Sequence, residues 1–157
     1  MAATKVKAGY GAVLSIGDGA TPTEVFTDIA EIVDVNDLTQ SLDVVDATHM
    51  ASPDGYAESI PTFKRTEPQT FTFNWVPTST SQRLLETARD DRRLASFRIT
   101  LPQYGSGGVR VAGKAYVTSL SWGAPHDNKT GGSVTLAWQG KPVLEDADGT
   151  ALTTAAP

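Results

Sequence analysis

The chain has 157 residues, of which 39% are hydrophobic, and it carries a formal net charge of −5. This length predicts a single domain with a core of its own. The absence of cysteine excludes disulfides and thiolate metal sites, no apolar run is long enough to predict a transmembrane helix, and the acidic balance argues against a general nucleic-acid binder.

The charges are unevenly distributed along the chain. Between Ala8 and Phe63 there is no Lys or Arg but ten acidic residues, so residues 1–63 have a net charge of −8 and residues 64–157 one of +3. One interpretation is that solvated faces differ in sign. The other is that unlike faces of neighbouring copies meet head to tail.

The first third of the chain predicts short strands separated by turns. The first predicted strand ends in the Gly17-Asp18-Gly19 turn, and Glu31 and Asp34 interrupt the apolar residues of 29–35. The expected strands are 11–16, 25–26, 29–35 and 42–48, the last with a phase slip in its middle.

Residues 49–61 interrupt this pattern with a long loop. They contain two prolines and the turn signal Pro53-Asp54-Gly55. The loop also carries Met50, Tyr56 and Ile60, which have no obvious place in the core of their own domain. A loop of this length and composition is either disordered or docked on another surface.

The strongest strand signal follows the loop. After a pairing segment at 62–67, residues 69–76 alternate apolar and polar side chains with period two. One face of this strand carries Phe71, Phe73 and Trp75, and the other carries Thr70, Thr72 and Asn74. The aromatic face predicts a contribution to the core.

One helix is expected, over residues 80–93. Ser79 and Gln82 have the spacing of a capping box, and a narrow apolar stripe indicates that the helix covers part of a sheet. Further strands are expected at 96–101, at 109–122 with a bend near Gly113, and at 133–138. From Glu145 the tail is small and polar.

Candidate catalytic and metal-binding residues are weak throughout. His49 lies near Asp46 and Asp54 in the sequence, but a loop histidine beside a strand end is usually structural. Residues 145–149 resemble part of a calcium loop without its closing Glu, and the glycines at 105–108 do not precede a helix. The sequence therefore predicts no enzyme, no cofactor and no metal site.

Residues 9–144 resemble the tail tube (major tail) proteins of long-tailed bacteriophages with non-contractile tails. The resemblance rests on the order of weak motifs: an early Gly-rich strand, the acidic segment 29–38, the run 42–49 before a long loop, a strand-helix-strand unit, and the ending formed by 116–122, 132–138 and 140–142. Residues 63–67 depart from the glycine-containing turn of many relatives.

The resemblance implies a mainly β fold, a β-sandwich or split barrel with one flanking α-helix, between an N-terminal arm (1–8) and a C-terminal tail (145–157). It implies hexameric rings stacked into a tube in the virion tail, assembled in the host cytoplasm. The implied partners are further copies of the chain and the tail tip or baseplate, tape-measure and tail terminator proteins. DNA would pass through the lumen without specific binding, and no membrane is involved.

Three groups of residues are expected to serve this assembly. Thr70, Thr72 and Asn74 would line the lumen, because a basic lining would bind the passing phosphates. Met50, Tyr56 and Ile60 would become ordered against an adjacent subunit, and Lys5 and Lys7 would bridge to acidic residues of the neighbouring ring.

The alternative is a monomeric β-sandwich binding module, either carbohydrate-binding or capsid-decorating. Such a module would expose Trp75, Trp122 or Trp138 as a ligand platform. All three are in phase with apolar neighbours or lie next to a strand end, which favours positions in the core instead.

Overall fold

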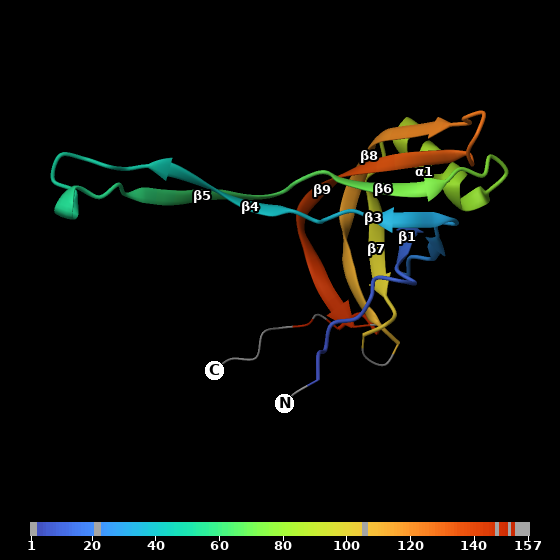
Figure 1. Ribbon diagram of the computed structural model, residues 1–157, viewed down its shortest axis with the longest axis horizontal. Coiled ribbons are helices and arrows are strands. Elements are labelled where there is room, and N and C mark those ends of the chain that lie inside the picture. The colour runs from blue at the N-terminus through green and yellow to red at the C-terminus, as the bar shows by residue number, and fades with distance from the viewer. Residues whose placement is uncertain (1–2, 21–22, 105–106, 147, 151, 153–157) are drawn as a thin grey trace.

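The computed structural model describes residues 3–20, 23–104, 107–146, 148–150 and 152. They form one seven-stranded antiparallel sheet, in the order β2-β1-β7-β8-β9-β6-β3, with one α-helix, and a separate two-stranded hairpin (Figure 1). The elements are β1 (Val13–Gly17), β2 (Phe26–Asp28), β3 (Ile32–Val35), β4 (Gln40–Asp46), the 3-10 turn η1 (Pro53–Gly55), β5 (Ser59–Thr66), β6 (Gln69–Asn74), α1 (Thr80–Asp90), β7 (Ala95–Leu101), β8 (Val109–Gly123) and β9 (Gly131–Asp146).

The long strands β8 and β9 give the sheet its bend. They have 15 and 16 residues, and their pairing shifts between Ala112 and Lys114 and again between Val117 and Ser119. Such bulges let a strand change direction, so the two halves of β8 and β9 run in different directions (Figure 1). The outer strands β2 and β3 are not paired with each other among the described residues, so the sheet is a split barrel and not a closed one. The expected mainly β fold with one helix is confirmed.

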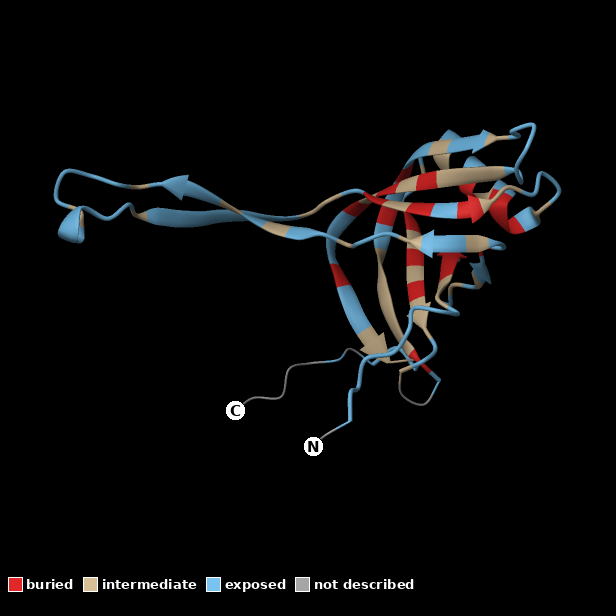
Figure 2. Ribbon diagram, viewed as in Figure 1, coloured by how far each residue is buried: buried red, intermediate tan, exposed pale blue. Residues whose placement is uncertain are grey.

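The concave side of the bent sheet is filled by the core. Its largest fully buried side chains include Phe71, Phe73 and Phe97, and α1 contributes Leu85 and Ala88. These residues are concentrated in the body, the part of the molecule formed by the seven-stranded sheet and α1 (Figure 2). No helix among the described residues has the length and apolar character needed to cross a membrane.

The start of the helix differs from the prediction. Ser79 occupies the N-cap position without a side-chain capping bond, so the expected capping box is wrong. The buried Gln82 side chain instead accepts a hydrogen bond from the backbone N–H of Val76 (2.9 Å) and donates to the carbonyl oxygens of Ala30 (3.0 Å) and Asn74 (2.8 Å). Three hydrogen bonds to backbone groups outside the helix therefore replace the single bond that a capping box would give Gln82.

Two strands differ in extent. The segment expected at 29–35 is shortened to β3, because Glu31 adopts a left-handed backbone conformation (φ 63°) before it. The segment expected at 133–138 is lengthened to β9, which continues two residues past Leu144. Gly140, with φ 74°, and the next two residues form a bulge between the pairs Gln139–Lys114 and Val143–Ala112. Pro142 therefore occupies a position where no ladder hydrogen bond is needed.

The strands β4 and β5 form a hairpin that extends away from the body (Figures 1 and 2). Residues 40–66 are called the long hairpin below, and residues 47–58 are its tip. The predicted phase slip in 42–48 corresponds to a bulge between Leu42 and Val44. The expected loop 49–61 is shorter, because its last three residues, Ser59–Pro61, pair with Asp46–Val44 as part of β5.

Candidate functional site

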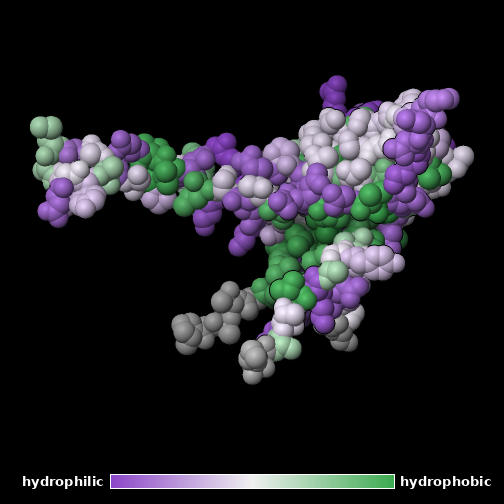
Figure 3. Space-filling model, viewed as in Figure 1, coloured by the Kyte–Doolittle hydropathy of each residue, from purple (hydrophilic) through white to green (hydrophobic). Residues whose placement is uncertain are grey.

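The long hairpin exposes apolar side chains on both of its faces. Neither β4 nor β5 contains a buried residue. Strand alternation places Leu42 and Val44 on one face and Val45, Ile60 and Phe63 on the other, and all five are at least half exposed. Figure 3 shows this apolar surface in the middle of the hairpin. An isolated two-stranded hairpin is marginally stable in water, so these faces are suited to contact with another molecule.

The tip of the hairpin is held by a small polar network around Glu58. Its carboxylate accepts a hydrogen bond from the Ser52 hydroxyl (2.7 Å) and lies 3.3 Å from Nε2 of His49. Asp46 instead accepts hydrogen bonds from the hydroxyl and backbone N–H of Thr48, which lower the pKa of its carboxyl. The contact of His49 with Glu58 supports the structural role expected for this loop histidine.

Two of the three residues expected to dock on a neighbour lie on the tip. Met50 is fully exposed and Tyr56 is 75% exposed, whereas Ile60 belongs to β5 and is 57% exposed. None of them packs against the body. Their exposure suits the expected contact with an adjacent subunit, and the contact itself remains a prediction.

The residues expected in the lumen lie on the polar face of the sheet, opposite the core. Thr72 is exposed, and Thr70 and Asn74 are half-buried. The Thr70 hydroxyl is hydrogen-bonded to that of Thr135 (3.1 Å), and the Asn74 amide donates to the Glu31 carboxylate (3.0 Å). Asn74 is thus partly used in fixing the turn before β3.

Sequence reasoning missed the hydroxyl residues that continue this surface onto β8 and β9. Ser133 pairs with Thr72 and its hydroxyl lies 2.7 Å from that of Ser121, while the Thr118 hydroxyl donates to the carbonyl of Thr135 (3.2 Å). The alternation in 116–122 and 132–138 contained this signal. We call the following residues the hydroxyl face: Thr70, Thr72, Thr118, Ser121, Ser133 and Thr135.

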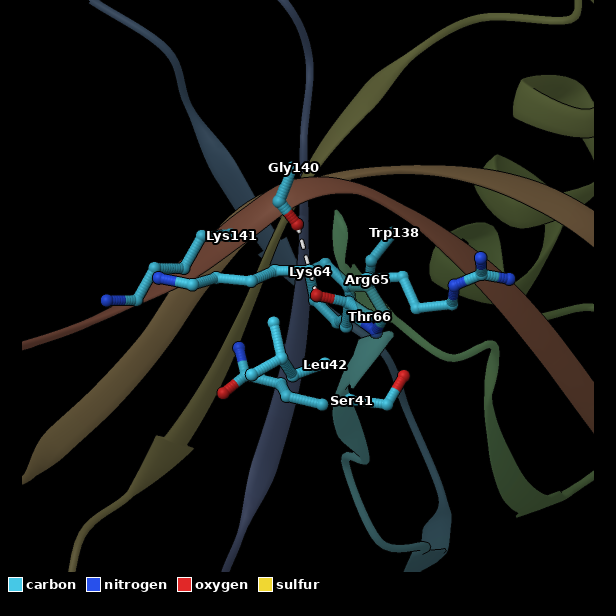
Figure 4. Close-up of a pocket in the computed structure, with 9 residues that line it drawn as sticks. Ser41, Leu42, Lys64, Arg65, Thr66, Trp138, Gly140 and Lys141 are labelled. Atoms are coloured by element: carbon cyan, nitrogen blue, oxygen red, sulfur yellow. Dashed lines mark hydrogen bonds between the residues drawn. The ribbon is translucent and has the colours of Figure 1, made fainter. Parts of the chain in front are cut away.

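A pocket of about 630 Å³ lies at the root of the long hairpin, where it meets β9. Its lining includes Leu42, Lys64, Arg65, Trp138 and Lys141, and the Thr66 hydroxyl donates to the carbonyl of Gly140 (3.1 Å). Lys64 and Lys141 extend toward the same side of this pocket (Figure 4). Arg65 is paired with Asp43, so the root presents mainly the two ammonium groups.

Lys5 and Lys7 lie in an exposed segment without regular structure. The backbone N–H of Lys7 donates to the hydroxyl of Tyr104 (3.0 Å), which ties the segment to the loop after β7. Within the described part of the chain, neither ammonium group has an acidic partner. Their expected role between rings therefore remains a prediction.

The three tryptophans differ in environment. Trp138 is buried at 6% exposure, as expected, and its indole N–H donates to the Gln69 side chain (3.2 Å). Trp122 is 61% exposed and stacks on the half-buried Trp75, with ring centroids 4.3 Å apart. The expected core position is wrong for Trp122, because the end of β8 extends beyond the part of the sheet that the core covers.

Residues 15–145 match the family described as lambda phage tail tube proteins. The chain belongs to this family. It is therefore a structural tail tube protein, a component of virion tails. No curated protein matches the chain.

Solved structures share this fold at low sequence identity. The virion of the native gene transfer agent particle contains a chain with a TM-score of 0.70 and 14% identity, covering 90% of this chain and all of that one. A chain of the anti-feeding prophage baseplate matches with a TM-score of 0.71 and 13% identity, and the match covers 94% of this chain and 99% of that one. A chain of the SPP1 tail tube matches with a TM-score of 0.59 and 12% identity, and the match covers 87% of this chain and 78% of that one.

Proposed function

We propose that six copies of the chain form a ring, that rings stack into a tube, and that DNA passes through the tube during ejection. The observation that carries this proposal is the long hairpin, which leaves the body with apolar side chains on both faces. A tube offers both faces a partner, since each subunit has neighbours within its ring and in the next ring. A chain with a similar fold occurs in the tail of the empty gene transfer agent particle, and that tail has C6 symmetry.

The edges of the sheet support the same arrangement. β2 and β3 are its outer strands, and Val33 on β3 is 52% exposed. An exposed strand edge is a liability for a free molecule, because its unpaired backbone groups can bind another strand. Pairing between neighbouring subunits would remove these edges and close the lumen wall.

The hydroxyl face is the proposed lumen surface. It carries hydroxyl groups, and Asp34 of β3 lies opposite Thr72 at its border. A wall of this composition neither binds phosphate strongly nor offers apolar surface to the bases, so DNA can slide along it. The role is structural and requires no catalytic residue.

The proposed contacts outside the rings involve the chain ends and the other tail proteins. Lys5 and Lys7 would meet acidic residues of the next ring, and the tube would join a tail tip or baseplate protein, a tape-measure protein and a terminator. Assembly in the host cytoplasm agrees with this scheme.

The test of the lumen assignment is the variant Thr72→Lys. Thr72 is exposed, so the variant is expected to fold and to form tubes of normal width, with six added ammonium groups per ring. Each phosphate contact adds about −0.9 to the log–log salt slope of duplex binding, so DNA delivery by particles carrying the variant is expected to fall.

The matched control is Thr72→Ser, which keeps a hydroxyl at the same position. Tube yield and width are measured by electron microscopy, and DNA delivery by infectivity or transfer. Normal delivery by Thr72→Lys tubes would show that this face lies outside the lumen. Failure of the unmodified protein to form tubes would contradict the assembly itself.

A further inference from the structure

A groove with an aromatic floor lies between α1 and the end of β8. It has a volume of about 370 Å³, and its lining includes Trp75, Leu120, Trp122, Arg83, Glu86 and Arg89. The paired indoles form its apolar side, with the rings inclined by only 13°. The exposed side chains of α1 form its charged side. These residues are called the indole groove below.

The packing of the body leaves the indole groove unexplained. Trp122 keeps 61% of its surface exposed, although stacking on Trp75 orders its ring. An ordered, exposed indole beside arginines has the composition of the residues that dominate binding energy at protein interfaces. The Arg89 guanidinium is paired with Asp90 (3.0 Å), whereas Arg83 has no ion-pair partner among the residues that the structure describes.

The tip of the long hairpin has the complementary chemistry. Met50 is fully exposed on the tip and Tyr56 is 75% exposed, and both thioether and aromatic groups pack favourably on indole rings. The tip residues 47–58 contain two acidic side chains and no Lys or Arg. Asp54 is exposed in η1 and has no ion-pair partner within the described residues, so it is available to Arg83.

The positions of the two surfaces decide how they can meet. The hairpin tip and α1 lie at opposite ends of the molecule (Figure 1), so the tip of a chain cannot enter its own groove. A contact between unlike ends of identical copies is heterologous, and repeating it generates a closed ring or a helical stack.

We propose that the hairpin tip of one copy binds in the indole groove of a second copy. Met50 and Tyr56 pack on the Trp75–Trp122 pair, and Asp54 faces Arg83. This proposal rests on the proposed function, because the second copy is a neighbour in the tube. It assigns the receptor of the hairpin, which tube formation alone leaves open.

The absence of cysteine makes a cross-linking test clean. Ala51→Cys on the tip and Glu86→Cys at the groove each introduce one thiol and retain Met50, Tyr56 and both indoles. A disulfide requires Cα atoms within about 7 Å. Tubes grown from an equal mixture are expected to yield disulfide-linked dimers on mild oxidation, and tubes of either variant alone are expected to yield none.

Two other positions serve as references in the same experiment. Lys141→Cys lies at the basic hairpin root, which is the competing receptor for an acidic tip, and Thr118→Cys lies on the hydroxyl face. Cross-linking of Ala51→Cys to Lys141→Cys instead of Glu86→Cys would overturn the proposal. So would the absence of tip–groove dimers in tubes seen by microscopy. If the unmodified chain formed no tubes, the proposed function would fail first.

Substitutions in the indole groove give a second, energetic readout. Trp122→Ala is expected to raise the critical concentration for assembly about thirty-fold, as for a central interface residue, and Trp122→Phe much less. Arg83→Glu is expected to raise it roughly two- to five-fold, and Asp54→Arg in the same chain is expected to restore it. Thermal unfolding of each free variant checks that the body is intact. Additive effects of Arg83→Glu and Asp54→Arg would contradict the pairing.

Discussion

The body and the long hairpin both consist of strands with apolar side chains, but the body buries these side chains and the hairpin exposes them. In the body, Phe71 and Phe97 are fully buried between the sheet and α1. In the hairpin, Phe63 is 77% exposed and Val45 is 56% exposed. Burial of apolar surface is the main favourable term in folding, so the body is stabilised within one chain and the hairpin lacks that stabilisation. Under the proposed function, a second copy supplies the missing contacts of the hairpin.

The largest effect is expected from a substitution that prevents the body from folding. Phe73 is 2% exposed, so Phe73→Lys removes a core ring at a cost of about 3–5 kcal/mol and adds the cost of burying an ammonium group. Against a typical stability of about 5–15 kcal/mol, this variant is expected not to fold. Circular dichroism with thermal melting measures whether the variant is folded. Thr72→Lys, one residue away on the opposite face, is the control, and a reversed result would mean that the faces of β6 are assigned incorrectly.

A smaller effect is expected at Gly132 of β9, which packs against β8 and the Phe73 ring. A Cβ atom on Gly132 would lie 2.5 Å from the carbonyl oxygen of Ser121 and 3.0 Å from the Phe73 ring. Gly132→Ala is therefore expected to lower the free energy of unfolding by about 1–3 kcal/mol. Gly123→Ala is the matched control, because nothing lies within 4 Å of its Cβ position. Equal melting temperatures for the two variants would contradict this packing.

The position of the core determines which parts of the structure the sequence could predict. In the body, a core on one side of the strand enforces period-two alternation, and this pattern correctly indicated the buried residues Phe71 and Phe73. Alternation failed as a guide at Trp122, because phase specifies the face of a strand and not how far the core extends along it. In the hairpin, two prolines and a turn signal predicted a loop at 49–61, although β5 already begins at Ser59 and includes Pro61.

Local rules also failed where tertiary partners compete. Ser79 and Gln82 have capping-box spacing, but the Gln82 side chain instead forms hydrogen bonds with backbone groups of Ala30, Asn74 and Val76. The strand expected at 133–138 continues to Asp146, because a bulge places Pro142 between ladder positions. For the hydroxyl face, the sequence prediction named only the β6 residues. Alternation indicates a polar side for β8 and β9, but the pairing that joins them to β6 in one surface follows from the fold.

A variant of Ile60 and Phe63 is expected to weaken the contacts of the hairpin and to leave the body unchanged. Replacing Ile60 and Phe63 with Ser removes exposed apolar groups and is expected to change the free energy of unfolding of the free chain by about 0.5 kcal/mol or less. Tube assembly is expected to be lost, as scored by sedimentation and microscopy. The Phe63→Leu variant keeps an apolar side chain and should assemble. Loss of folding in the serine variant would show that the hairpin stabilises its own chain.

The smallest effect is expected at the N-terminal arm, which resembles the hairpin in having no core contact. Lys5 and Lys7 are exposed, and an exposed ion pair contributes only about 0.2–1 kcal/mol, so the double variant with Glu at both positions is expected to slow tube growth by no more than several-fold. Repetition around each ring makes this small term measurable by light scattering.

Salt separates an electrostatic contact from a packing contact at this arm. The Debye length falls from about 10 Å at 0.1 M to about 3 Å at 1 M, so the growth rates of the variant and the unmodified chain should converge at high salt. A variant with Gln at both positions should be intermediate, because it removes the attraction without adding repulsion. Defects at the hairpin faces should persist at high salt, since burial of apolar surface is not screened. Equal growth at low salt would mean that the arm makes no contact between rings.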